Sequence, residues 1–152
     1  MKTNRYTLLI LILLFRNFIF GQVLEKNIVG IWQADSSEVT SMYHDTYQFY
    51  KNGNFEFKPD GYNGLNRVLS INGRYELKKD TVLLYIKSTK EIVGGYPNRS
   101  EITTLSDTWE IINGKIKTFT FKKNILQKVK INKCSDEKCI LIDDRKFYLI
   151  EE

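Results

Sequence analysis

The sequence predicts an all-β fold, an antiparallel up-and-down meander barrel of about 8–10 strands. Three observations carry this prediction. Apolar and polar residues alternate with a period of two through most of the chain after residue 30, as they do on half-buried strands. Turn-forming pairs such as Asn52-Gly53 separate these segments at short spacing, which is typical of hairpins. No segment after residue 22 shows a helical period, apart from about one turn at 23–28.

In the first half of the chain the predicted strands are short and end at recognisable turns. They cover, in order, the start at Gly30-Ile31-Trp32 and residues 47–50, 55–58 and 69–78. Asn52-Gly53 joins the second strand to the third, because this pair readily adopts the positive φ angles of a tight hairpin turn. Lys79-Asp80 ends the fourth strand.

In the second half the same alternation continues to the end of the chain. The predicted strands cover residues 82–86, 109–111, 118–122, 129–131, 139–142 and 147–150. Tight turns are predicted at Asn113-Gly114 and at residues 135–138. The two prolines, Pro59 and Pro97, fall just after predicted strands, where no ladder hydrogen bond is lost.

The predicted connections differ in length in a regular way. Successive connections of a meander alternate between its two ends, and the long ones, at residues 36–45, 59–66 and 94–100, share one end. This arrangement predicts a cup with a closed end and an open, loop-rich end, where a ligand would bind. The candidate rim residues are Tyr43, His44, Tyr62, Asn63, Tyr96 and Arg99. The alternative is that these are ordinary turn residues on surface loops.

The barrel interior is predicted to be partly filled. A barrel of about eight strands either fills its interior with side chains or holds one small ligand. Large aromatic side chains are expected to point inward from the strands: Phe49, Phe55, Phe57, Tyr75, Trp109, Phe119 and Phe121. So many bulky groups leave room for a small cavity at most.

Residues 1–21 have the layout of a signal peptide. Lys2 and Arg5 precede an apolar stretch at residues 6–15, and Gly21 offers a small residue for cleavage. The apolar stretch is too short for a permanent transmembrane helix, which needs about 20 residues. We therefore expect an exported protein, periplasmic or extracellular, with no stable membrane span after cleavage. Residues 22–152 then form one domain.

Removal of the leader also changes the charge. The loss of Lys2, Arg5 and Arg16 lowers the basic residues from 23 to 20 against 18 acidic residues, so the net charge falls from +5 to +2. Nucleic-acid binding requires a clustered basic excess. The lysines here alternate with apolar residues, as on the solvated face of a strand, so no nucleic-acid partner is expected.

Cys134 and Cys139 are the only cysteines and flank a polar, turn-like segment. On paired strands either side of a hairpin loop, their Cα atoms would lie within the roughly 4.4–6.8 Å that a disulfide needs. An oxidising compartment favours this bond. A redox dithiol or a zinc site is less favoured, because the usual spacing and the further ligands are missing.

The Gly30-Ile31-Trp32 start followed by a β-meander resembles the lipocalins and the wider calycin-type barrels. The stretch from Phe49 through Gly53 to Phe55 is similar to the exported lipocalin-like domains of Bacteroidetes-type bacteria. The resemblance implies a lipocalin-like barrel in which Trp32 covers the closed end and Gly30 allows the chain to turn tightly against it. The T-D-Y motif of the lipocalins is not evident.

The chain offers little catalytic chemistry. His44 is the only histidine and stands beside Asp45, but no nucleophile with an activating setting accompanies this pair. A His-based metal site would need Asp45 and Asp60 to converge on His44, and no cofactor motif is present. Asp143-Asp144 before Arg145 is interpreted as a solvated turn. No catalytic residue, metal or cofactor is therefore predicted.

These observations predict an exported non-enzymatic barrel that binds a small hydrophobic or amphipathic ligand at its open end. The alternative is an interaction module in which the tyrosine-bearing loops bind an envelope protein or a glycan, because tyrosine provides a large contact area at low entropic cost.

Overall fold

The computed structural model describes residues 28–37, 44–99, 109–134 and 138–151, and these residues form eight strands and no helix. The strands in chain order are β1 (Gly30–Ala34), β2 (Thr46–Phe49), β3 (Asn54–Lys58), β4 (Val68–Lys78), β5 (Thr81–Arg99), β6 (Trp109–Lys133), β7 (Cys139–Ile142) and β8 (Arg145–Glu151). This confirms the predicted all-β meander.

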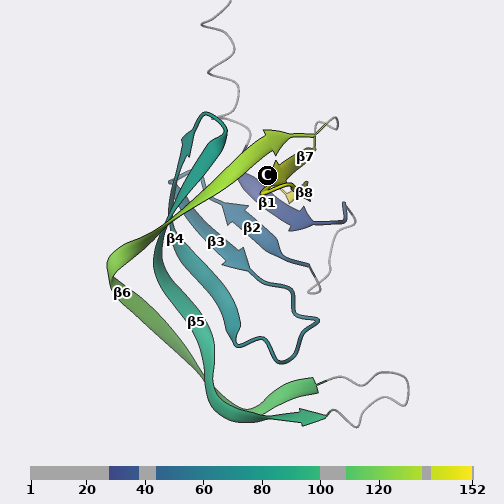
Figure 1. Ribbon diagram of the computed structural model, residues 1–152, viewed down its shortest axis with the longest axis vertical. Coiled ribbons are helices and arrows are strands. Elements are labelled where there is room, and N and C mark those ends of the chain that lie inside the picture. The colour runs from purple at the N-terminus through teal and green to yellow at the C-terminus, as the bar shows by residue number, and fades with distance from the viewer. Residues whose placement is uncertain (1–27, 38–43, 100–108, 135–137, 152) are drawn as a thin grey trace, which may run out of the picture.

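The strands pair antiparallel in sequence order, and β8 pairs with β1 to close the ring (Figure 1). The Asn52-Gly53 hairpin forms as predicted, with Phe49 opposite Phe55. Gly53 has a φ of 80°, the left-handed conformation that tight turns require of glycine. β6 and β7 pair over only three residues of β6, Ile131 to Lys133.

β5 and β6 are far longer than the sequence suggests, at 19 and 25 residues. The predicted loop at 94–100 and the predicted turn at Asn113-Gly114 are both wrong, because residues 94–99 and 113–114 lie inside these strands. Gly94, Gly95 and Asn113 do take the positive φ angles that turn residues favour. These angles kink the two strands without interrupting their pairing, in which Gly94 lies opposite Gly114.

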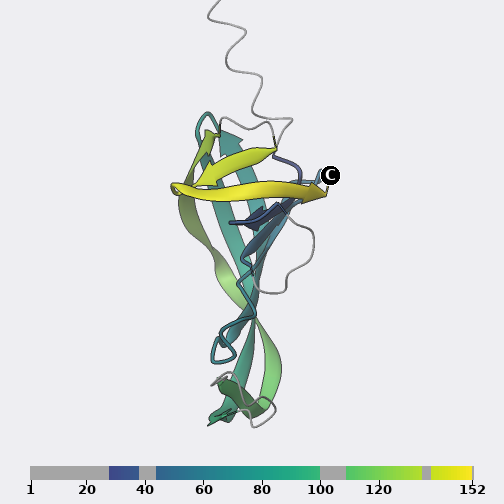
Figure 2. The same cartoon turned by 90° about the vertical axis from the view of Figure 1, so that its right-hand side faces the viewer.

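The two long strands divide into a barrel part and an arm. Their register shifts where Ile86 pairs with Ile125 but Ser88 pairs with Thr120. Beyond this shift, residues 88–99 and 109–120 project away from the ring (Figures 1 and 2); we call this hairpin the arm. Trp109 and Phe119 lie on the arm and are 48 % and 41 % exposed. The prediction that they face the barrel interior is therefore wrong.

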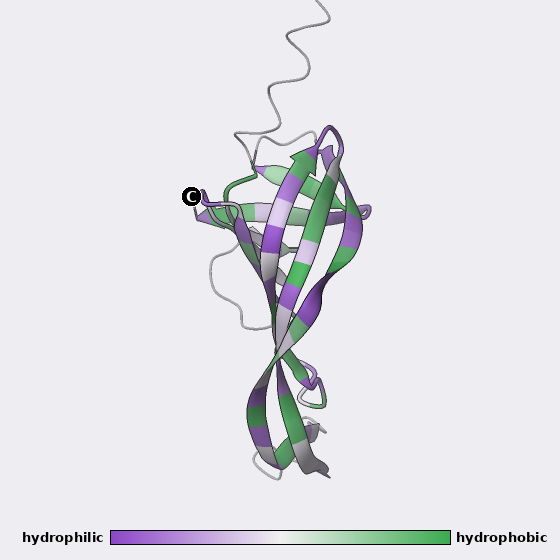
Figure 3. Ribbon diagram, turned by 90° about the vertical axis from the view of Figure 1, so that its left-hand side faces the viewer, coloured by the Kyte–Doolittle hydropathy of each residue, from purple (hydrophilic) through white to green (hydrophobic). Residues whose placement is uncertain are grey.

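The core lies inside the ring, above the arm in Figure 1. Hydrophobic and hydrophilic bands alternate along the long strands (Figure 3), as sheets with one buried face require. Phe49 and Phe55 are buried as predicted, and Phe57, Tyr75 and Phe121 pack against the core. Burial, with a smaller contribution from nearby carboxylates, raises the pKa of the Tyr47 hydroxyl to about 12. Burying an aromatic side chain contributes about 1.5–3 kcal/mol, so this cluster is a main source of stability.

Gly30 and Trp32 are the first and third residues of β1. Trp32 is 2 % exposed, and its indole Nε1 donates a hydrogen bond to the Ile28 carbonyl oxygen at 2.8 Å. Gly30 has a φ of +132°, and a Cβ there would lie 2.6 Å from the Glu151 carbonyl oxygen and 2.7 Å from Leu149 Cδ1. No larger residue fits where β1 meets β8.

The predicted disulfide between Cys134 and Cys139 is present. Their Cα atoms are 5.4 Å apart, and the bond joins the end of β6 to the start of β7. It therefore closes the short connection at the end of the ring opposite the β1–β2 and β3–β4 connections.

Candidate functional site

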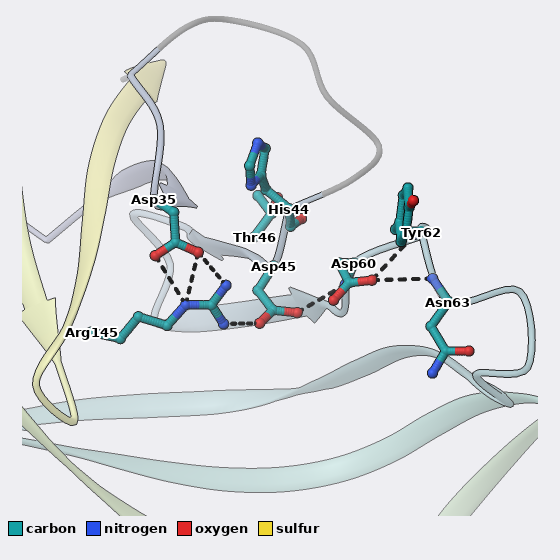
Figure 4. Close-up of polar contacts among 8 residues, drawn as sticks. All are labelled: Asp35, His44, Asp45, Thr46, Asp60, Tyr62, Asn63 and Arg145. Carbon is teal, nitrogen blue, oxygen red and sulfur yellow. Dashed lines mark hydrogen bonds and ion pairs between the residues drawn. The ribbon is translucent and has the colours of Figure 1, made fainter. Parts of the chain in front are cut away.

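The connections that follow β1, β3 and β7 lie at one end of the meander, because successive connections of antiparallel strands alternate between ends. We call this the loop end. It comprises residues 35–45, 59–67 and 143–144, of which residues 38–43 are outside the described residues. The β5–β6 connection at residues 100–108 is likewise outside the described residues. Polar side chains from the β1–β2 and β3–β4 connections and from the start of β8 meet in a single row (Figure 4).

Arg145, the first residue of β8, lies at the centre of this row. Its guanidinium binds Asp35 through two nitrogens: Nη2 is 2.6 Å and Nε is 3.1 Å from Asp35 Oδ2. Nη1 donates to Oδ2 of Asp45. The planar guanidinium can bridge two carboxylates in this way because its five N–H donors point in fixed directions. Arg145 thus joins both ends of the β1–β2 connection to the start of β8.

The row continues from Asp45 into the β3–β4 connection. Asp45 Oδ1 accepts a hydrogen bond from the Asp60 backbone N–H at 2.8 Å. Asp60 Oδ1 in turn accepts from the backbone N–H groups of Tyr62 at 3.2 Å and Asn63 at 3.4 Å. Such local carboxylate-to-backbone bonds are how aspartate shapes turns. The loop end is therefore held together from β8 to the β3–β4 connection.

The charges of this row support one another. The hydrogen bond from Arg145 holds the pKa of the Asp35 carboxyl below its ordinary value, against a smaller opposing effect of burial. The same bond raises the pKa of the Arg145 guanidinium, which burial opposes. The Asp35 and Arg145 side chains remain 51 % and 42 % exposed, so water screens the pair and its net contribution is small. The row mainly positions the connections.

A hollow of about 370 Å³ lies beside this row, a volume near the lower limit for small-molecule sites. We call it the loop-end hollow. Its polar lining comes from the end of the β1–β2 connection, the start of β2, the end of β3 and the β3–β4 connection: His44, Thr46, Lys58, Asp60, Asn63 and Asn66. Val68, Leu69 and Ile92 provide an apolar wall. The lining therefore suits a small molecule with one polar and one apolar side.

The apolar wall includes a residue of β5 because Arg67 attaches the β3–β4 connection to the arm. The Ile92 backbone N–H donates to the Arg67 carbonyl oxygen at 2.8 Å. Arg67 Nη1 donates to the carbonyl oxygens of Gly94 at 2.6 Å and of Ile92 at 3.2 Å. These bonds bring Ile92 close to Val68, and both residues line the hollow.

The structure brings together only some of the predicted rim residues. His44 and Asn63 line the hollow. Tyr62 is on the same connection, 73 % exposed, and outside the hollow lining. Tyr96 and Arg99 are on the arm, near the end of β5, and the Tyr96 hydroxyl accepts a weak hydrogen bond from Asn113 Nδ2 at 3.4 Å. Tyr43 lies outside the described residues.

His44 and Asp45 do not form an acid–base pair in this structure. Asp45 uses its two oxygens for Arg145 and for the Asp60 backbone, and the His44 imidazole is directed away from this carboxylate (Figure 4). In the described part of the chain, no three His, Cys, Asp or Glu side chains are grouped so that they could hold a metal ion. Nor do the described residues include a helix that is long and apolar enough to cross a bilayer.

Sequence reasoning considered Asp45 and Asp60 only as partners of His44, in a catalytic pair or a metal site, and it assigned no role at the loop end to Asp35 or Arg145. The turn at Asp143-Asp144 does form, with φ angles of 48° and 66°. Asp143 is more than a solvated residue, however, because its Oδ1 accepts the Lys130 backbone N–H at 2.9 Å. The positions of Asp35, Asp45 and Asp60 next to strand ends are the signal in the sequence for polar contacts at the loop end. The partner of Asp35 and Asp45, Arg145, is too distant in sequence to be recognised.

Comparison of the chain with protein-family models, curated proteins and solved structures gives no significant match in any of the three. The fold and the loop-end hollow are therefore the basis for functional inference.

Proposed function

We propose that this protein is an exported, non-enzymatic, lipocalin-like barrel that binds a small amphipathic molecule in the loop-end hollow. The observation that carries the proposal is the hollow itself, about 370 Å³ in volume, with polar groups on one side and Val68, Leu69 and Ile92 on the other. Small-molecule sites commonly combine an apolar wall with a few placed polar groups.

The surroundings support the same function. The hollow lies at the loop end, where the long connections of the predicted cup gather. The bonds from Arg145 through Asp45 to Asp60 hold the polar side of the hollow in place before a ligand arrives, and such preorganisation lowers the cost of binding. Lys58 can face an anionic or hydroxyl group. The side-chain NH2 groups of Asn63 and Asn66 can donate to the same group, while their oxygens accept the backbone N–H groups of Leu65 and Val68. Export is supported by the disulfide between Cys134 and Cys139.

Native mass spectrometry of protein purified from the periplasm tests this proposal. We expect a bound mass on the wild type that is lost when Lys58, in the hollow, is replaced in K58A. Lys78→Ala is the matched control, because both lysines pair with the glutamate two residues earlier, Lys58 at 3.3 Å and Lys78 at 3.6 Å, and Lys78 is not among the residues lining the hollow. A wild type without bound mass and without any thermal shift in a small-molecule panel would contradict the proposal.

A second candidate is the interaction module, which would bind an envelope protein or a glycan. Tyr62, Tyr96 and Trp109 are 73 %, 53 % and 48 % exposed. Tyr62 belongs to a connection that meets the arm, because a Cβ at Gly64 would collide with the Trp109 carbonyl oxygen. Exposed aromatic side chains of this kind are frequent binding anchors. Loss of glycan-array or envelope-protein binding in Y62A and W109A, with the bound small molecule unchanged, would favour this second function.

A further inference from the structure

The second edge of β6 is unpaired over most of its length. β6 pairs with β5 along almost its whole length, from Trp109 to Lys130, but β7 covers only Ile131 to Lys133 on the other side. No described strand pairs with the second edge before residue 131, and β6 runs along the margin of the molecule (Figure 1). Such an edge presents backbone N–H and C=O groups to which another strand can bind.

The direction of these groups follows from Lys130. Its backbone N–H donates to Asp143 Oδ1 and its carbonyl oxygen accepts from the Asp143 N–H, both at 2.9 Å. The backbone groups of Lys130 therefore face away from β5. Because such groups alternate in direction along a strand, and pairing with β5 is regular from Ile125 to Lys130, those of Leu126 and Lys128 also face the open edge.

The charge of β6 is one-sided. The strand contains one acidic residue, Glu110, and seven lysines, all of them exposed: Lys115, Lys117, Lys122, Lys123, Lys128, Lys130 and Lys133. Among the described residues, no carboxylate forms an ion pair with any of these ammonium groups. Lysines along an edge discourage pairing with a second copy of the same strand, because like charges then oppose each other.

We propose that the open edge of β6 binds an acidic, extended segment of a partner polypeptide as an added β-strand. Main-chain hydrogen bonds to Leu126 and Lys128 would provide affinity, as in other cases of strand addition. Val129 and Ile131 are buried, so Lys128 and Lys130 project from the outer face of the sheet. Acidic side chains at alternate positions of the added strand would lie next to these two lysines.

Two pairs of variants distinguish backbone pairing from simple charge attraction. Leu126→Pro removes an edge-facing N–H while every lysine is kept, and proline is tolerated on an edge strand. Leu126→Ala removes the side chain but keeps the N–H. Lys128→Glu combined with Lys130→Glu reverses the charge at the proposed site. Lys51→Glu changes one charge in the β2–β3 turn, away from β6.

The probe is a synthetic peptide of alternating glutamate and threonine, titrated into the full-length mature protein by fluorescence anisotropy at low salt. We expect L126P and the double glutamate variant to weaken binding on the order of tenfold or more. L126A and K51E should stay within about twofold of the wild type. Circular dichroism of L126P establishes that the variant is folded; if it is not, N-methylation of alternate peptide residues, which removes donors from the probe instead, replaces it.

Three results would overturn the proposal. One is no binding of the alternating peptide to the wild type. Another is equal binding of a proline-interrupted peptide of the same charge, which would mean charge attraction without strand addition. The third is concentration-dependent dimerisation of the wild type that L126P abolishes, since a second copy would then occupy the edge.

Discussion

Arg145 Nη2 lies 2.6 Å from Asp35 Oδ2, although 110 residues separate the two in sequence. The contact joins the end of β1 to the start of β8, next to the pairing that closes the ring. Arg145 also lies 5.7 Å from the centre of the Phe147 ring, so the guanidinium rests against the core aromatic cluster while it holds two carboxylates.

Replacing Arg145 with lysine should lower the free energy of unfolding modestly. A lysine keeps the charge but cannot form the two-nitrogen contact with Asp35. Because the pair is partly exposed, we expect a loss of about 0.5–1 kcal/mol, or a fall in melting temperature of about 2–5 °C. Thermal denaturation of R145K measures this, with R74K at an exposed position of β4 as the control. An unchanged melting temperature would mean that the row is incidental.

The Asp35–Arg145 pair should make stability depend on acid pH. The pKa of Asp35 is lowered in the folded state, so the pair contributes stability above the unfolded pKa of about 3.9. This contribution is lost as the pH falls through the lower, folded value. Asp35→Asn retains a residue that tolerates the left-handed φ of 64°. Urea denaturation should show a wild-type advantage at pH 6 that shrinks below about pH 4; a constant difference would contradict this.

Tyr47 should make the free energy of unfolding depend on pH in the alkaline range, with stability lost as the pH rises. Its folded pKa is raised to about 12, above the unfolded value of about 10. The neutral hydroxyl is therefore favoured by folding, and this contribution is present below about pH 10 and lost as the pH rises towards the folded value. Tyr47→Phe should reduce the loss of stability between about pH 10 and 12, as measured by urea denaturation. Tyr62→Phe, on an exposed side chain, should behave as the wild type. If Y47F lost as much stability as the wild type between these pH values, Tyr47 would not be the source of the alkaline dependence.

Gly30→Ala should be clearly destabilising. The new Cβ combines an unfavourable φ with a collision against the Glu151 carbonyl oxygen at 2.6 Å, and we expect a cost of about 2–3 kcal/mol. Gly53→Ala separates the two effects, because Gly53 also has a positive φ but no atom nearer than 4.0 Å to the added Cβ. It should cost about 1 kcal/mol. Chemical denaturation compares the two variants, and equal losses would show that the collision is relieved.

Local patterns predict much of this fold because they reflect local physics. Alternation places Phe49 and Phe55 in the core, and the polar segment between the cysteines predicts their bond. The predicted turn at Asn113-Gly114 is wrong for a related reason. These residue types indicate a position with positive φ, and such a position occurs both in a turn and in a kinked strand. Only the pairing of Gly94 with Gly114, which is non-local, distinguishes them.

The candidate site was less predictable than the fold. His44 and Asn63 could be assigned to a loop-rich end because connection lengths are visible in the sequence. Lys58, Val68 and Ile92 could not, since their convergence depends on the register between β4 and β5 and on the bonds from Arg67 to the arm. Register in a closed sheet is set by every strand at once.

The brief pairing between β6 and β7 gives the ring a seam. The two strands pair through Ile131 to Lys133, with Asp143 bonded to Lys130 on one side. On the other side are the Cys134–Cys139 disulfide and a hydrogen bond from the Cys134 backbone N–H to the Cys139 carbonyl oxygen at 3.4 Å. Amide protons here should exchange with solvent sooner than those shared by β4 and β5, because fewer neighbouring bonds must break for the segment to open. Reduction of the disulfide would release one end of this short pairing. The redox state of the surroundings would therefore govern how readily β6 and β7 separate and the ring opens into a curved sheet.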